Sequence, residues 1–380
     1  MQPLFWDESH RETRDLARAW ADRYIRPHAG DWEEENIFPK DLYAKAGEDG
    51  ILGVDYSESL GGSGGDIFHA LIVVEELIRA GSVGTAVGLG SHTISLPPIL
   101  SLGTQAQRDR FAVPVVEGRK IACLAITEPG TGSDVARVRT TARREGDHYV
   151  LDGAKTFITS GTRADVIVLL ARTSEHPHGG LTFFVVEGGT PGLSIGKPLK
   201  KMGWWASDTA EFFLDNCRVP VQNRLGEEGS GFKALMANFV KERLFLGANC
   251  VSIAQLALDA SLSYVGQREA FGRPLSGFQV TRHKLAEMAT RTEQARSFVS
   301  VVAEGYRRGE DVRATVAMAK NAAADACSFV TDAAVQLHGG MGYMRESLVE
   351  RLYRDARLYP IGGGTTEIMR EIISKSLLHG

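Results

Sequence analysis

The hydrophobic and polar positions along this 380-residue chain change their period twice. From residue 8 to about 118, apolar residues recur at helical spacing, and Leu16, Trp20 and Tyr24, for example, lie four residues apart. From about residue 119 the period becomes 2, as in half-buried strands, and from Gly229 onwards it is helical again. The pattern predicts a mainly α protein with a central β-domain.

The first region predicts several helices joined by a glycine-rich loop, Leu60–Gly65. Because no strand precedes this loop, a surface loop explains it better than a phosphate cradle. Asp66 is placed to cap an apolar helix that continues through Leu77. A second apolar helical segment runs from Val83 to Leu102, with a kink expected at Pro97-Pro98.

The middle and last regions predict a sheet and a helical bundle. The stretch Val138–Thr159 alternates, and Arg144-Glu145-Gly146-Asp147 within it is typical of a hairpin turn. Further strands are predicted near 166–170, 182–186 and 209–214, and helices at about 229–265, 278–308, 310–337 and the end of the chain.

Three domains follow from these elements: an N-terminal helical domain at 1–118, a small β-barrel or sandwich at 119–228, and a C-terminal four-helix bundle at 229–380. The net charge of −4 gives no basic footprint, so neither nucleic acid nor an anionic membrane surface is expected as a partner. Four cysteines without paired metal-ligand spacing predict reduced thiols and no metal site. With no signal peptide and no apolar run judged long enough for a membrane span, we expect a soluble cytoplasmic protein.

One position stands out in the segment Met236–Val251, which is apolar almost all round apart from a charged triplet centred on Glu242. At helical spacing Glu242 shares a face with Leu235, Phe239 and other apolar residues, so its carboxylate must be paired, protonated or functional. It is either a structural partner of Arg243 or a general base. The helix alone favours the structural pair, because ion-pair networks perturb carboxylates more often than catalysis does.

Blocks spread along most of the chain resemble those of the acyl-CoA dehydrogenase family, in that family's order. Any one of them is a weak signal, whereas the ordered set is specific. The seven blocks are Ala125–Asp134, Lys155–Gly161, Lys201–Gly203 with Ser207–Thr209, Leu225–Gly229, Arg268–Arg273, Gln336–Tyr343 and Gly364–Ile368.

The resemblance implies a flavoenzyme that removes an α proton and a β hydride from an acyl-CoA thioester. The products are then trans-2-enoyl-CoA and reduced FAD, and the electrons pass to an electron-transfer flavoprotein. The resemblance also implies a homotetramer, a dimer of dimers, in which the ADP half of FAD reaches the neighbouring subunit.

The resemblance further implies which residues hold FAD. Phe157 is aromatic where the family more often has tryptophan; without the resemblance, a place in the β-domain core explains it equally well. Arg268 suits pyrophosphate as a fork of donors, and His338 is interpreted as a turn histidine without a catalytic role. The implied FAD contacts are Leu124, Ile126, Thr127, Phe157, Ile158, Thr159, Arg268, Phe271, Gln279, Gln336, Gly339, Gly340, Thr365 and Glu367.

The last block departs from the commoner family pattern. Many members carry the catalytic glutamate there as Tyr-Glu-Gly-Thr, whereas this chain has glycine at 363. A minority, including the long-chain and isovaleryl types, takes the base from a Glu-Arg pair on the first bundle helix, where Glu242-Arg243 falls. The resemblance, closest to the long-chain type, thus implies Glu242 as the base and Gly363 N–H as half of the oxyanion site.

Substrate contacts are implied for Ser133, Arg243 and Gly364, and Arg243 is expected to keep Glu242 oriented and ionisable. Two rival hypotheses share the fold. One is an oxygen-reactive flavin oxidase, and the other is a flavin-binding scaffold that has lost its catalytic base. The presence of Glu242 favours the dehydrogenase over both.

Overall fold

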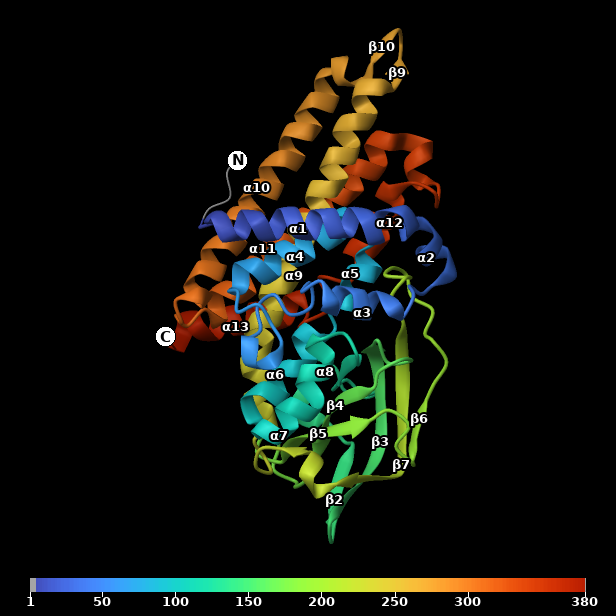
Figure 1. Ribbon diagram of the computed structural model, residues 1–380. Helices are drawn as coiled ribbons and strands as arrows, with labels where there is room; N and C mark the ends of the chain where they lie inside the picture. Colours follow the sequence, from blue (N-terminus) through green and yellow to red (C-terminus); the bar gives the residue numbers. More distant parts are fainter. Residues whose placement is uncertain (1–4, 380) are drawn as a thin grey trace.

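The computed structural model describes residues 5–379 and shows three regions in the predicted order (Figure 1). A β-sheet occupies one end of the molecule, and two long helices of the last region reach the other. The predicted fold class is confirmed. The helices of the first region are α1 (Glu8–Tyr24), α2 (Ala29–Glu35), α3 (Asp41–Glu48), α4 (Ile67–Arg79), α5 (Val83–Leu89), α6 (His92–Leu102), α7 (Gln105–Gln107) and α8 (Val113–Val116).

Helix α1 buries a face that differs from the predicted row of large residues. Leu16 is 54% exposed, whereas Ala17, Trp20 and Ala21 are buried. The small alanines allow α1 to approach α4 closely, and Leu16 lies outside this contact stripe.

The apolar segment 83–102 forms two helices, and its interruption lies at Gly90-Ser91 rather than at the prolines. The buried Ser91 hydroxyl donates at 3.0 Å to a backbone carbonyl of the first strand, β1 (Ala122–Ala125), which ties the chain to the sheet at this point. Pro97 and Pro98 lie inside α6. Pro98 cannot donate to the carbonyl of Ile94, and Asn238 of helix α9 (Gly231–Gln267) donates to that oxygen instead, at 2.9 Å.

The middle region is one mixed sheet with strand order β6-β7-β3-β2-β4-β5-β8, and β1 pairs in parallel with β4. The hairpin predicted at 144–147 is confirmed, because Glu145 pairs with His148 and Gly146 has φ +62°. The strands are β1 (Ala122–Ala125), β2 (Thr141–Glu145), β3 (His148–Thr159), β4 (Val166–Arg172), β5 (Leu181–Glu187), β6 (Leu193–Ile195), β7 (Thr209–Pro220) and β8 (Arg224–Leu225).

The last region contains three long helices, a small hairpin and two shorter helices. The single final helix expected from the sequence is two helices, because the glycines at 362–364 form a turn that no helix continues through. The elements are α9 (Gly231–Gln267), β9 (Glu269–Ala270), β10 (Arg273–Pro274), α10 (Gln279–Arg307), α11 (Arg313–His338), α12 (Leu348–Ala356) and α13 (Thr366–His379).

Helix α9 connects two hydrophobic cores. Leu235, near its start, packs in the core beneath one face of the sheet, whereas Leu244 and Phe245 belong to the core shared by the two helical regions. Glu242 lies between these two groups. The helix therefore carries the acidic residue through the junction of the domains.

The length and apolar composition of α9 also qualify it as a membrane-spanning helix. The sequence-based expectation that no apolar run approaches a span is therefore wrong for this segment. Its most apolar 18-residue window is 72% buried inside the protein, which is usual for a core helix. Contact with a different core at each end explains why so many of its faces are apolar.

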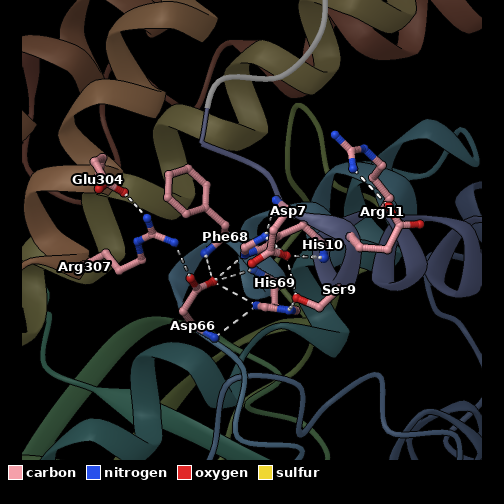
Figure 2. Close-up of polar contacts among 10 residues, drawn as sticks. Asp7, Ser9, His10, Arg11, Asp66, Phe68, His69, Glu304 and Arg307 are labelled. Atoms are coloured by element: carbon pink, nitrogen blue, oxygen red, sulfur yellow. Dashed lines mark hydrogen bonds and ion pairs between the residues drawn. The ribbon is translucent and has the colours of Figure 1, made fainter.

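Asp66 connects α1, α4 and α10 in a cluster that we call the helix clasp, formed by Asp7, His10, Asp66, His69 and Arg307 (Figure 2). Asp7 and Asp66 are the N-caps of α1 and α4, and the imidazoles of His10 and His69 complete two capping boxes. His10 Nδ1 accepts the Asp7 N–H, so its Nε2 carries the hydrogen that is donated to Asp66 Oδ1 at 3.0 Å.

The clasp also has the residue types of a cation site, since ligand atoms of His10, Asp66 and His69 lie within 4.8 Å of one another. Both Nδ1 atoms, however, accept backbone N–H groups, and the Arg307 guanidinium lies 3.2 Å from Asp66 Oδ2. These contacts account for the three residues without a metal ion. The clasp is best described as a joint between three helices.

Candidate active site

The carboxylate of Glu242 faces the glycine turn between α12 and α13. A Cβ atom placed on Gly363 would lie 3.5 Å from Glu242 Oε1, so the carboxylate fills the space beside that glycine. The side chain is partly exposed along its length, yet Oε2 is buried and has no hydrogen-bond partner within residues 5–379. Burying an acceptor without a hydrogen-bond partner costs free energy. Such an oxygen is expected where a bound ligand supplies the hydrogen-bond donor.

Burial raises the pKa of Glu242 to about 7, and the positive charges of Arg243 and Lys320 oppose this rise. A carboxyl with such a pKa exchanges a proton near neutral pH, as a general base must. The structural ion pair considered from the sequence predicts the opposite direction of shift. The geometry therefore favours a general base over a structural ion pair at Glu242.

The turn that faces Glu242 requires glycine for two reasons. Gly363 and Gly364 have φ of +64° and +97°, a region that side-chain-bearing residues rarely adopt. A Cβ on Gly363 would also lie 2.2 Å from Leu246 Cδ1. Among the residues that the structure describes, the Gly363 N–H donates to no protein acceptor, so it is free to bind a ligand oxygen.

Arg243 does not form the direct pair with Glu242 that the sequence led us to expect. No ion pair within 4.0 Å joins them; the buried guanidinium instead donates from Nε to Gly363 O at 3.3 Å and lies over the Phe239 ring. Both side chains reach Gly363, Glu242 with its carboxylate and Arg243 by a hydrogen bond to the carbonyl, without pairing with each other. It affects Glu242 through its charge and holds the turn that Glu242 faces.

Phe157 lies on an exposed edge of the sheet region and not in its core. Its ring is 68% exposed and its φ is +61°, where a bulky residue is strained. The β3–β7 register shifts between Lys155 and Ile158, and this bulge turns Phe157 outward. The alternative of plain core packing is therefore wrong for Phe157, whereas the Ile158 side chain is buried and only its backbone can face a ligand.

The loop with Thr127 lies directly beside this bulge, because Thr156 N–H donates to Thr127 O at 2.8 Å. Leu124 and Ile126 precede Thr127 along the same strand and loop, and Thr159 closes β3. Ser133 is exposed in the continuation of the loop. The structure thus brings the predicted residues of the β-domain together in one strip.

A buried ion pair between Lys155 and Glu128, which the sequence analysis did not predict, lies next to this strip. Lys155 is fully buried, and its ammonium lies 2.8 Å from Glu128 and 3.0 Å from Ile126 O. Glu128 also accepts from the Thr140 hydroxyl. Both charged residues belong to the family-like blocks, but strand alternation alone does not show that their side chains meet.

A second set of predicted residues lies elsewhere. Arg268 directly precedes the β9–β10 hairpin and the 96% exposed Phe271 lies in its turn, at the end of the molecule opposite the sheet (Figure 1). Tyr264 of α9 stacks on His338 at 4.3 Å and donates to its carbonyl, which places the next residues, the 339–340 turn, beside this end. Gln279, Gln336, Gly339 and Gly340 are likewise exposed.

One chain therefore does not bring all predicted FAD contacts together. The β-domain strip lies towards the end of β3 that meets the helices, where Ser160 contacts Tyr43 of α3, whereas the β9–β10 hairpin lies at the far end of the molecule (Figure 1). Thr365 and Glu367 lie with the glycine turn: Thr365 Oγ1 accepts the Ile368 N–H at the start of α13, and Glu367 is exposed.

Lys320 of α11 is a further site residue that sequence reasoning missed. It is fully buried and donates from Nζ to Gly364 O at 2.9 Å. Helical spacing places Lys320 on one face with Val316, Ala324 and Cys327, all of which are buried. A lysine on an apolar helix face was the signal that would have identified it.

Three family models match this chain in succession. The acyl-CoA dehydrogenase N-terminal domain matches residues 7–119, the middle domain residues 123–217, and the C-terminal domain residues 229–378. Together they cover most of the chain.

Individual relatives agree with these models. The crystal structure of acyl-CoA dehydrogenase from Geobacillus kaustophilus is 39% identical, with a TM-score of 0.96 over 99% of this chain and 100% of that one. The long-chain specific mitochondrial enzyme of Sus scrofa is 37% identical, covering 98% of this chain and 87% of its own length. The short-chain specific enzyme of Rattus norvegicus is 39% identical, covering 98% and 90%.

Long-chain and short-chain relatives are thus similar to this chain to the same degree, so the likeness to the long-chain type expected from the sequence is not resolved at the level of subtype. The family itself is shown by the models and the relatives together. The chain belongs to the acyl-CoA dehydrogenase family and is a FAD-dependent oxidoreductase acting on CH–CH groups.

Proposed function

We propose that this protein dehydrogenates an acyl-CoA thioester to trans-2-enoyl-CoA, with Glu242 as the catalytic base, and passes the electrons to an electron-transfer flavoprotein. The observation that carries the proposal is the Glu242 carboxylate, which faces a glycine turn and whose buried Oε2 has no hydrogen-bond partner among residues 5–379; the Gly363 N–H likewise donates to no acceptor among these residues. A base and an oxyanion donor beside each other are what removal of an α proton from a thioester needs.

In this mechanism Glu242 accepts the α proton of the acyl chain. Its raised pKa keeps the carboxyl basic enough to take a weakly acidic proton, while Arg243 and Lys320 keep part of the population ionised at neutral pH. The Gly363 N–H donates to the thioester oxygen and stabilises the negative charge that develops there as the proton leaves.

The residues present fit FAD. The outward-turned Phe157 ring offers a wall for a flat ring system, and Thr127 with the adjacent backbone offers donors and acceptors. When bound in this strip, FAD supplies the acceptor for the β hydride. Phe157 and the bulge that turns it outward then set the orientation of the ring relative to Glu242.

A homotetramer, built as a dimer of dimers, belongs to the same proposal. The position of the hairpin supports it, because β9 and β10, which Arg268 and Phe271 adjoin, lie at the end of the molecule away from the sheet that carries the β-domain strip (Figure 1). A 96% exposed aromatic ring at the tip of a hairpin suits contact with a neighbouring copy. Light scattering gives the number of chains, and Arg268→Ala should lower FAD content.

The direct test is anaerobic flavin reduction by a panel of acyl-CoA thioesters, from short straight chains to long and branched ones. Glu242→Gln should lower the rate with the best substrate by about 10²–10⁴-fold with unchanged FAD content, because it removes the base. Asp259→Asn, an exposed acid on the same helix, is the matched control and should keep the wild-type rate. A wild-type rate in Glu242→Gln would refute the proposal.

The same preparation separates the rival functions. An oxidase of this fold would be reoxidised by air after reduction, without any protein acceptor. A catalytically inactive scaffold would stay oxidised with every thioester in the panel. The dehydrogenase that we propose is reduced by at least one thioester and is reoxidised rapidly by an electron-transfer flavoprotein.

A further inference from the structure

Lys320 is a charged side chain in an unusual position, because no part of it is exposed and it lies among the alanines of α11. Burial lowers its pKa from the usual range. A buried ammonium must be matched by acceptors or opposite charge. Its hydrogen-bond acceptor is Gly364 O at 2.9 Å, which belongs to the turn that faces Glu242.

Two cations therefore hold two successive carbonyls of this turn. Arg243 of α9 donates to Gly363 O, and Lys320 of α11 donates to Gly364 O. The neighbouring Asn321 donates to Thr366 O at 3.2 Å, so the start of α13 is held from the same helix. These contacts fix the peptide planes of a segment that, with two glycines at positive φ, has few conformational restraints of its own.

We propose that Lys320 is a positioning residue for the reaction: its ammonium holds the Gly363–Gly364 turn so that the Gly363 N–H and the Glu242 carboxylate face the same thioester. This inference rests on the proposed function and adds to it a residue outside the family-like blocks. Lys320 acts through Gly364 and through its charge.

The charge of Lys320 has a second effect, on the acid itself. The charged groups that act on Glu242 are Arg243 from its own helix and Lys320 from α11, and both lower its pKa against the effect of burial. Burial lowers the pKa of Lys320, whereas Cys250 of α9 and Asp325 of α11 raise it. Burial raises the pKa of the Cys250 thiol, so Cys250 stays neutral, and Glu242 is the carboxylate of α9 whose charge acts on the ammonium.

The test is the titration of Glu242 in the FAD-loaded protein, read from the infrared band of its protonated carboxyl, which is identified by its loss in Glu242→Gln. In Lys320→Met the midpoint should rise by about one pH unit, since a nearby positive charge is removed. Flavin reduction should show the same shift in its acidic limb. Lys320→Gln removes the charge but keeps a donor for Gly364, and it should shift the midpoint equally if Lys320→Met does not fold.

Asn321→Ala is the matched control, because it removes the neighbouring tether without changing charge. It should leave the Glu242 midpoint in place and at most lower thermal stability. An unchanged midpoint in both Lys320 variants, or an equal shift in Asn321→Ala, would overturn the inference. The infrared titration does not depend on turnover, so its outcome is separate from the test of Glu242 as the base.

Discussion

Two carboxylates, Glu128 in the β-domain and Glu242 on α9, differ in how the protein satisfies them. Glu128 lies 2.8 Å from the Lys155 ammonium and accepts hydrogen bonds from the backbone of Arg139 and from the backbone and hydroxyl of Thr140. These partners lower its pKa despite burial. Oε2 of Glu242 is buried and has no hydrogen-bond partner in the described part of the chain, and burial raises the pKa of Glu242 to about 7.

The difference separates a structural acid from a reactive one. Both oxygens of Glu128 accept hydrogen bonds from protein groups, from Arg139 and Thr140 of its own segment and from Lys155 of β3, so its charge is already compensated within the protein. Glu242 keeps an unused acceptor at the junction of two cores, where only a ligand or a proton can satisfy it. A nearby cation is common to both and therefore does not decide the role.

Breaking the satisfied pair should have the largest effect on stability. Lys155→Met removes a fully buried cation and leaves Glu128 buried without its counter-charge, which should lower the free energy of unfolding by about 3–5 kcal/mol. Because Thr127 and Phe157 lie beside this pair, FAD content should fall as well. Urea unfolding and flavin absorbance measure the two effects.

The double variant Lys155→Met/Glu128→Gln sharpens this prediction. Removing both charges should recover much of the lost stability, because no uncompensated charge then stays buried. If the double variant were as unstable as the sum of the two single variants, the pair would not be acting as a unit.

Replacing Glu242, the acid without a hydrogen-bond partner on Oε2 in the described chain, should raise the stability of the protein at high pH instead of lowering it. A carboxyl whose pKa is about 7 in the folded chain and 4.5 ordinarily binds more protons when folded, so stability falls as the pH rises between these values. Glu242→Gln removes this loss and should be more stable than wild type at pH 8, by about 1–3 kcal/mol. At pH 4 the two proteins should unfold at nearly the same denaturant concentration.

A lower stability of Glu242→Gln at pH 8 would contradict the description of Glu242 as an unsatisfied acid. Asp355 is also buried with its pKa raised to about 7, so the Glu242→Gln variant retains part of the same pH dependence. The comparison therefore uses the difference between the two proteins at each pH.

The smallest expected effect on the free energy of unfolding comes from a substitution in the helix clasp. Contacts with His10, His69 and Arg307 lower the pKa of Asp66, so its contribution is present above about pH 4 and is lost as the pH falls towards its folded pKa. Asp66→Asn should lower the free energy of unfolding by about 1 kcal/mol at pH 7, as for a weakened cap. The difference from wild type should narrow below pH 4; a difference that is constant from pH 3 to 7 would rule out the charge as its source.

Much of the fold was predictable because hydrophobic period reports directly on helices and strands. The hairpin at Gly146, the cap at Asp66 and the strands at 166–170, 182–186 and 209–214 were all found. The interruption at Gly90 was missed, because it depends on a hydrogen bond from Ser91 to the sheet and on Asn238 supporting α6 beside its prolines. Such contacts between distant segments leave no local pattern.

The candidate site was predictable to a similar extent. Helical spacing was enough to place Glu242 among apolar residues, and the family resemblance, with glycine at 363, implied where it would point. The direction of Arg243 and the presence of Lys320 were not predicted, because both depend on how α11 and the glycine turn pack against α9. The outward turn of Phe157 likewise depends on a bulge between β3 and β7.

The 37-residue helix α9 has a consequence for the evolution of this chain. It carries Glu242 near one end and leads directly into Arg268 at the other, and a helix of this length extends for about 55 Å. One inserted or deleted residue between them would rotate one end by about 100° relative to the other. Changes in length should therefore accumulate in the loops, whereas the number of residues in α9 should stay constant among homologues.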